Sequence, residues 1–190
     1  GVPFVAQRFA QEPLANPDGD YAISNRIAPT TFGTGLVEQV YSWKLISLSD
    51  PNDANGDGIS GRPNVNSSFQ VKRFGSQACE VTLEAFIRKA LEQEFGVTAA
   101  EQAANAAFYN ADVALLLAFV RSLPAPEPVI PAGREQQVAD GEVVFGEVGC
   151  TGCHFASLPL PGGGTFIHPY SDYLLHDMGR GLDDEIGLCG

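Results

Sequence analysis

The sequence predicts a mainly α-helical protein in which long irregular loops separate the helices. Residues 80–95 carry apolar side chains at the three- and four-residue spacing of a helix, and residues 112–123 are strongly apolar and end at a proline. The first 35 residues contain many Pro, Gly and Asn positions without a lasting period, so loops and short strands are expected there. With 190 residues, 44% of them hydrophobic, the chain can form one large domain or two small ones.

The expected elements begin with a turn and a short helix within residues 31–40. The amphipathic helix at 80–95 follows, and Gly96 is its stop signal. Thr98 and Glu101 have the spacing of a capping box, which predicts the start of another helix.

A proline-rich stretch, residues 125–132, follows the apolar helix and predicts an extended linker. Beyond it, residues 136–149 carry one apolar helix face, formed by Val138, Val144, Phe145 and Val148. We therefore expect a first unit at 1–124 and a second unit at 133–190.

Cys150-Thr151-Gly152-Cys153-His154 has the Cys-x-x-Cys-His spacing at which c-type haem is attached. Two thiols at this spacing can each add to a haem vinyl group, and the adjacent imidazole can bind the iron. Zinc normally needs four ligands, and the chain has no second Cys-x-x-Cys. A dithiol redox pair would follow a strand, whereas a helical pattern comes before Cys150. We expect haem c held by Cys150, Cys153 and His154, with zinc or a dithiol as weaker alternatives.

The residues before this motif, Gly-x-x-Val-Phe-x-x-x-Gly, resemble the first helix of class I cytochromes c. The apolar helix at 112–123 resembles the closing helix of such a domain. The resemblance implies cytochrome c-like haem domains in which the ring of Phe145 lies on the haem edge.

Candidates for the sixth iron ligand lie within 25 residues of the haem motif. The chain has three histidines and one methionine, and besides His154 these are His168, His176 and Met178. A methionine ligand raises the redox potential and suits electron relay, so Met178 is the first choice and His176 the second. If the sixth position stayed open, His176 could act as acid and base in splitting peroxide. The alternatives are a core role for Met178 and a turn role for His168.

Asp53, Asn55 and Asp57 place oxygen-bearing side chains at alternate positions, with Gly58 next. This is the first half of a calcium loop, because Ca²⁺ needs six to eight oxygen ligands and a sharp turn to gather them. Asn64 stands where an EF-hand would carry glutamate. The alternative is an ordinary surface turn rich in Asp, Asn and Gly.

The formal net charge of −12 argues against nucleic acid and anionic membranes as partners and favours a basic redox partner protein. The sequence has no apolar run of about 18 residues that could span a membrane.

Taken in order, several stretches resemble the di-haem oxidoreductases related to bacterial di-haem cytochrome c peroxidases, including proteins labelled thiol oxidoreductases. The stretches are Arg26–Pro29, Phe32–Glu38, Asp53–Asn64, Arg73–Gly75, Phe95–Thr98, the Cys-x-x-Cys-His motif and Pro169–Gly179. The resemblance implies two haem c domains, electron transfer with peroxidase-like chemistry, and a calcium site between the domains.

Haem c attachment further implies a periplasmic or cell-surface location, where Cys79 and Cys189 could form a disulfide. The first unit lacks a haem motif, and only 36 residues follow His154. We therefore expect an internal fragment of a longer protein, or a chain completed by a neighbouring haem subunit in a larger complex. The alternative functions are a pure electron carrier and a subunit of a redox assembly without substrate chemistry.

Overall fold

The computed structural model describes residues 28–179 and residue 189. This part of the chain is mainly helical, as predicted, and its few strands are only two residues long. In chain order the elements are α1 (Thr34–Val37), α2 (Ser42–Ser47), β1 (Gly61–Arg62), α3 (Leu83–Phe95), α4 (Ala99–Ala104), α5 (Ala106–Ser122), α6 (Glu135–Glu147), the 3₁₀ turn η1 (Cys150–Gly152), β2 (Leu158–Pro159), β3 (Phe166–Ile167) and β4 (Leu175–His176). Strand β1 pairs antiparallel with β4, and β2 pairs antiparallel with β3. The expected loops at residues 1–27 lie outside the described residues.

The ends of the central helices follow the sequence signals. Gly96 ends α3 with φ +68°, a conformation that glycine adopts without steric cost. Thr98 and Glu101 form the predicted capping box, in which each side chain accepts a hydrogen bond from the other residue's backbone N–H. Helix α5 begins at Ala106, earlier than the apolar run at Asp112, because the preceding alanines and aromatic residues continue the helix.

The buried side chains form two clusters. One lies between α3 and α5 and consists of Phe74, Leu83, Ile87, Val113 and Leu117. The other joins the α2 region to β2 and β3 and consists of Val40, Leu45, Val71, Leu158, Leu160 and Ile167.

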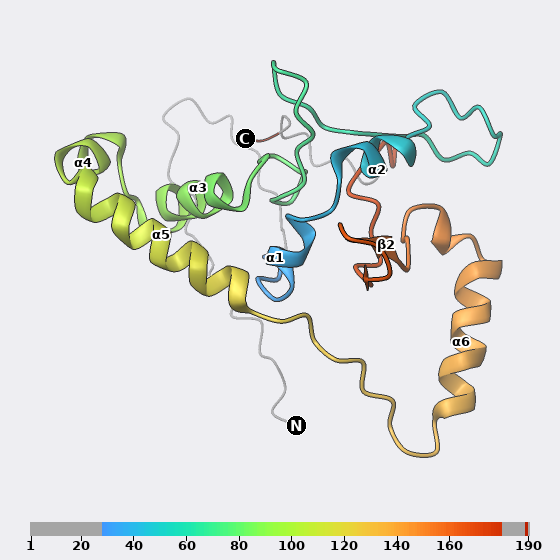
Figure 1. The fold of residues 1–190 in the computed structure, drawn as a ribbon. Coiled ribbons are helices and arrows are strands. Elements are labelled where there is room, and N and C mark those ends of the chain that lie inside the picture. Colours follow the sequence, from blue (N-terminus) through green and yellow to red (C-terminus); the bar gives the residue numbers. More distant parts are fainter. Residues whose placement is uncertain (1–27, 180–188, 190) are drawn as a thin grey trace, which may run out of the picture.

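The proline-rich linker is extended, as its composition predicts, and runs along one side of the molecule from α5 to α6 (Figure 1). The second cluster nevertheless takes residues from both sides of the linker, since Leu45 and Leu158 are both completely buried in it. The linker therefore does not separate two cores among the described residues, although it divides the sequence into two units.

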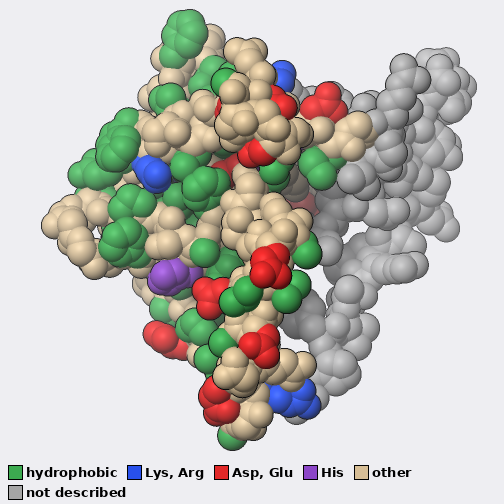
Figure 2. Space-filling model, turned by 90° about the vertical axis from the view of Figure 1, so that its right-hand side faces the viewer, with side chains coloured by type: hydrophobic (Ala, Val, Ile, Leu, Met, Phe, Trp, Pro, Cys, Tyr) green, Lys and Arg blue, Asp and Glu red, His purple; other side chains and the backbone are tan. Residues whose placement is uncertain are grey.

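Helix α6 lies apart from the other helices (Figure 1), and none of its side chains is buried. The face of the molecule that carries α6 shows acidic side chains interspersed with hydrophobic ones (Figure 2). None of the helices in residues 28–179 combines the length and apolar character needed to cross a membrane. A disulfide joins Cys79 to Cys189 across 110 residues of sequence.

Candidate haem-binding site

The Cys-x-x-Cys-His motif forms a tight turn directly after α6. Gly149 ends the helix with φ +84°, and the 3₁₀ turn η1 carries Cys150. The backbone N–H of His154 then donates to the carbonyl oxygen of Cys150 at 2.9 Å. Cys150 and Cys153 are both half-buried and form no disulfide. The local fold therefore keeps two free thiols and the histidine on one turn of chain.

His154 is held by a single bond from one ring nitrogen. Its Nδ1 atom lies 2.9 Å from the backbone carbonyl oxygen of Tyr170. A carbonyl oxygen can only accept, so Nδ1 carries the hydrogen and Nε2 carries the lone pair of the neutral ring. Metal-binding histidines characteristically donate their second ring N–H in this way. With an exposed side chain, His154 meets the requirements of an iron ligand through Nε2.

The ring of Phe145 lies next to His154 and also next to the ring of Tyr170. The ring centre of Phe145 lies 6.0 Å from that of His154 and 5.9 Å from that of Tyr170, and the rings of Phe145 and Tyr170 are close to perpendicular at 87°. Phe145 therefore lies beside the histidine, and its position on a haem edge stays a prediction. The anchoring role of Tyr170 was not predicted, because it depends on a backbone carbonyl that every residue type possesses.

His176 lies between Cys153 of the motif and Asp172. Its Nε2 atom is 2.7 Å from the Oδ2 atom of Asp172, and its Nδ1 atom is 3.7 Å from the sulfur of Cys153. Asp172 is only 4% exposed, and its backbone N–H donates to the carbonyl oxygen of Cys153. Asp172 is a second site residue that sequence reasoning missed.

The environment of Cys153 disfavours its thiolate. Burial raises the pKa of this thiol, and the nearby carboxylates of Asp172 and Asp57 raise it further. Cys153 is therefore a protonated thiol at neutral pH.

The remaining ligand candidates lie in different surroundings. Met178 is 63% exposed, so its thioether is not part of the described core. His168 bonds through Nδ1 to the carbonyl oxygen of Ala156 at 3.0 Å and lies among the residues that line a separate cavity. Of the candidates, the structure brings only His176 into contact with the haem motif, and both of its ring nitrogens have neighbours there.

The acidic loop uses its side-chain oxygens to hold its own backbone. Asp53 accepts from the N–H of Gly58 at 3.1 Å, and Asp57 accepts from the N–H of Ile59 at 2.8 Å. The amide of Asn55 donates to Asp57 at 3.0 Å. In residues 28–179, no three His, Cys, Asp or Glu side chains are arranged as a metal site.

This loop also packs against the haem motif. The side chain of Ile59 occupies the position that a Cβ atom on Gly152 would need. Gly61 pairs with His176 in the β1–β4 ladder, and a Cβ atom on Gly61 would lie 2.9 Å from the Cε1 atom of His176. Glycine at both positions therefore lets the acidic loop lie directly on the haem motif and on His176.

No protein-family model, curated protein or solved structure matches this chain. The functional argument therefore depends on the motif and on the geometry around it.

Proposed function

We propose that this chain binds haem c through thioether bonds to Cys150 and Cys153, with Nε2 of His154 as an iron ligand, and that it transfers electrons. The observation that carries the proposal is the 2.9 Å bond between Nδ1 of His154 and the carbonyl oxygen of Tyr170. In the neutral ring this bond leaves the lone pair on Nε2, and the exposed ring directly follows two free thiols in the sequence. A zinc site would need four ligands, and among the described residues no three His, Cys, Asp or Glu side chains are arranged to hold a metal ion.

Uncovered apolar surface around the motif also supports haem binding. Val143 and Val144 of α6 and Val148 directly after it are 60%, 51% and 68% exposed, and Tyr170 is 48% exposed. Soluble proteins seldom leave such a patch open, and a porphyrin attached at Cys150 and Cys153 would cover apolar surface beside the motif.

The haem would supply a one-electron redox centre, and the chain would hold it and set its surroundings. His176 faces Asp172 and Cys153, so its ring nitrogens are less available than the exposed thioether of Met178. This favours Met178 as the sixth ligand and electron relay over peroxide chemistry with His176 as acid and base. We propose that the protein is an exported redox protein of the di-haem oxidoreductase type, with a basic redox partner.

Covalent haem attachment is the first test. The chain would be exported in a bacterial host that matures c-type cytochromes, denatured, separated by electrophoresis and stained for haem. We expect covalent haem in the parent chain and in Cys79→Ala, and none in the double variant Cys150→Ala/Cys153→Ala. A parent chain without covalent haem, or a double variant that retains it, would overturn the proposal.

Iron ligation is tested with a matched pair of histidine variants. His154 and His168 each bond through Nδ1 to a backbone carbonyl, but only His154 follows the two thiols. We expect His154→Ala to change the visible spectrum of the haem protein, and His168→Ala to leave it unchanged. Equal effects of the two variants would remove His154 as the ligand.

Carbon monoxide separates electron relay from substrate chemistry. If Met178 occupies the sixth position, the spectrum of the reduced protein does not shift with carbon monoxide, and that of Met178→Ala does. A shift in the parent protein would favour an open iron site and peroxidase-like chemistry.

A further inference from the structure

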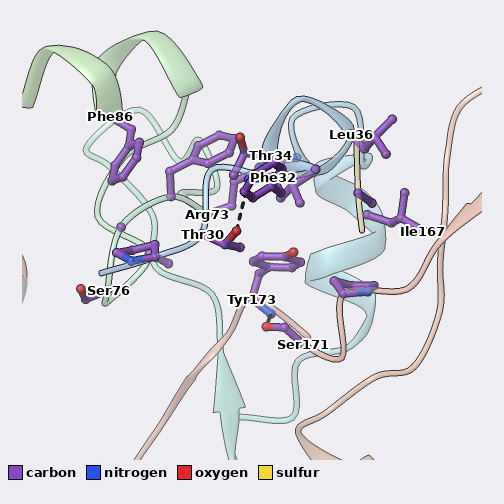
Figure 3. A pocket seen from close by; sticks show the side chains of 18 of the residues that line it. Thr30, Phe32, Thr34, Leu36, Arg73, Ser76, Phe86, Ile167, Ser171 and Tyr173 are labelled. Carbon is purple, nitrogen blue, oxygen red and sulfur yellow. Dashed lines mark hydrogen bonds between the residues drawn. The ribbon is translucent and has the colours of Figure 1, made fainter. Parts of the chain in front are cut away.

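A cavity lies between α1, residues 73–78 and residues 167–175, and no residue of the Cys-x-x-Cys-His motif lines it. It has a volume of about 430 Å³, within the range of small-molecule sites. Figure 3 shows Phe86 and Ser76 on one side, Leu36 and Ile167 on the other, and Tyr173 between them. None of the residues proposed to hold haem lines this cavity, so the inference below does not depend on the proposed function.

Arg73 lines the cavity and is a buried cation without a carboxylate partner among the residues that the structure describes. Its side chain donates to the carbonyl oxygen of Val40 and, at 2.7 Å, to the hydroxyl of Ser42, and both acceptors are neutral. Arg73 is 8% exposed, and its buried Nε atom has no hydrogen-bond partner. No carboxylate forms an ion pair with it in the part of the chain that the structure describes.

The nearest acidic candidate is already engaged. Glu38 forms an ion pair with Arg121 at 2.7 Å and accepts a hydrogen bond from the backbone N–H of Leu83. Burial lowers the pKa of Arg73 and the charge of Glu38 raises it, but a guanidinium remains charged in proteins. A buried charge is costly unless it is paired, so Arg73 would be stabilised by an anion in the cavity it lines.

Tyr173 provides a second polar group at the cavity. Burial raises its pKa to about 12, so its hydroxyl stays protonated and able to donate. The backbone of Tyr173 has φ +58°, and its N–H donates to the hydroxyl of Ser171 at 3.1 Å. This turn directs the chain so that the ring lines the cavity (Figure 3).

We propose that this cavity binds a small apolar carboxylic acid as its anion. The carboxylate would face Arg73 and the hydroxyl of Tyr173, and the apolar body would lie against Phe32 and Phe86. A carboxylate is favoured over a neutral polar group because it alone compensates the charge of Arg73. The aromatic and aliphatic walls favour an apolar body over a sugar or a nucleotide.

The test is calorimetric titration of the purified protein at pH 7 with 2-naphthoate and, as the neutral control, 2-naphthamide. We expect the carboxylate to bind at least about tenfold more tightly, the size expected for one charge-assisted hydrogen bond. Equal affinities, or no binding of either compound, would overturn the proposal.

Two variants place the binding in this cavity. Arg73→Gln should abolish the preference for the carboxylate. Because Arg73 also supports the fold, Tyr173→Phe provides a milder test and should weaken naphthoate binding several-fold. Tyr41→Phe, which changes an exposed tyrosine outside the cavity, should leave binding unchanged. Unaltered binding in Tyr173→Phe together with a retained preference in Arg73→Gln would contradict the proposed site.

Discussion

A shared core across the linker predicts strong energetic coupling between Leu45 and Leu158. Both side chains are 0% exposed and belong to one cluster, although one precedes the linker and the other follows the haem motif. Replacing Leu158 by alanine removes three buried carbons, a transfer cost of about 2.4 kcal/mol at about 0.8 kcal/mol for each. The cavity left behind raises the expected loss of unfolding free energy to about 2–5 kcal/mol.

The assay is urea unfolding of the purified protein followed by circular dichroism, for both single variants and the double variant. Residues that share a cluster typically show a coupling of about 0.5–3 kcal/mol. Leu83 provides the matched control, because it is equally buried but belongs to the cluster between α3 and α5. The effects of Leu83→Ala and Leu158→Ala should therefore add within about 0.5 kcal/mol.

Two results would refute this reasoning. Additive effects of Leu45→Ala and Leu158→Ala would mean that the two sides of the linker do not share a core. Two separate unfolding transitions, with each variant moving only one, would lead to the same conclusion.

Three further predictions concern the helices. Gly35→Ala should lower the unfolding free energy by about 1–3 kcal/mol in urea unfolding, because its Cβ atom would lie 2.8 Å from the backbone of Arg121; an unchanged midpoint would contradict this contact. Burial raises the pKa of Glu38, but bonds from Arg121 and Leu83 lower it below its ordinary value of 4.5. The stabilisation from the charged Glu38 carboxylate is therefore present above that value and is lost as pH falls below it. The unfolding free energy measured from pH 6 to pH 3 should fall more steeply in the parent protein than in Glu38→Gln. Parallel curves would refute this. Thr98→Ala should lower the unfolding free energy by about 1 kcal/mol through loss of the capping box of α4, whereas Thr98→Ser should leave it nearly unchanged. Equal losses in the two variants would argue against the cap.

Local signals predicted the helix ends, because the interactions that fix them lie within one turn. Thr98, Glu101 and Gly96 act on neighbouring backbone groups, so residue type and spacing are sufficient. The contact of Leu45 with the segment after the haem motif could not be predicted in this way. It joins residues more than a hundred positions apart, and their apolar character fits many partners equally well.

The haem motif was recognisable for the same local reason, since its thiols and imidazole lie within five residues. The bond that orients His154 was not, because Tyr170 contributes a backbone oxygen and its side chain carries no signal for that role. Asp172 could be identified as a site residue only from the structure, which shows His176 between Cys153 and Asp172. The sequence thus indicated which side chains are candidates for haem attachment, and the structure was needed to show what orients them.

The Cys-x-x-Cys-His motif is supported by segments distant in sequence as well as by Phe145 of its own helix. Helix α6 buries none of its side chains, whereas Ile59 packs on Gly152 and the carbonyl of Tyr170 holds His154. The β1–β4 pairing joins these two segments at Gly61 and His176. A movement of the acidic loop would therefore reach Cys153 through its contact with His176. For this reason the loop at residues 50–61 influences the geometry of the proposed haem site whether or not it binds calcium.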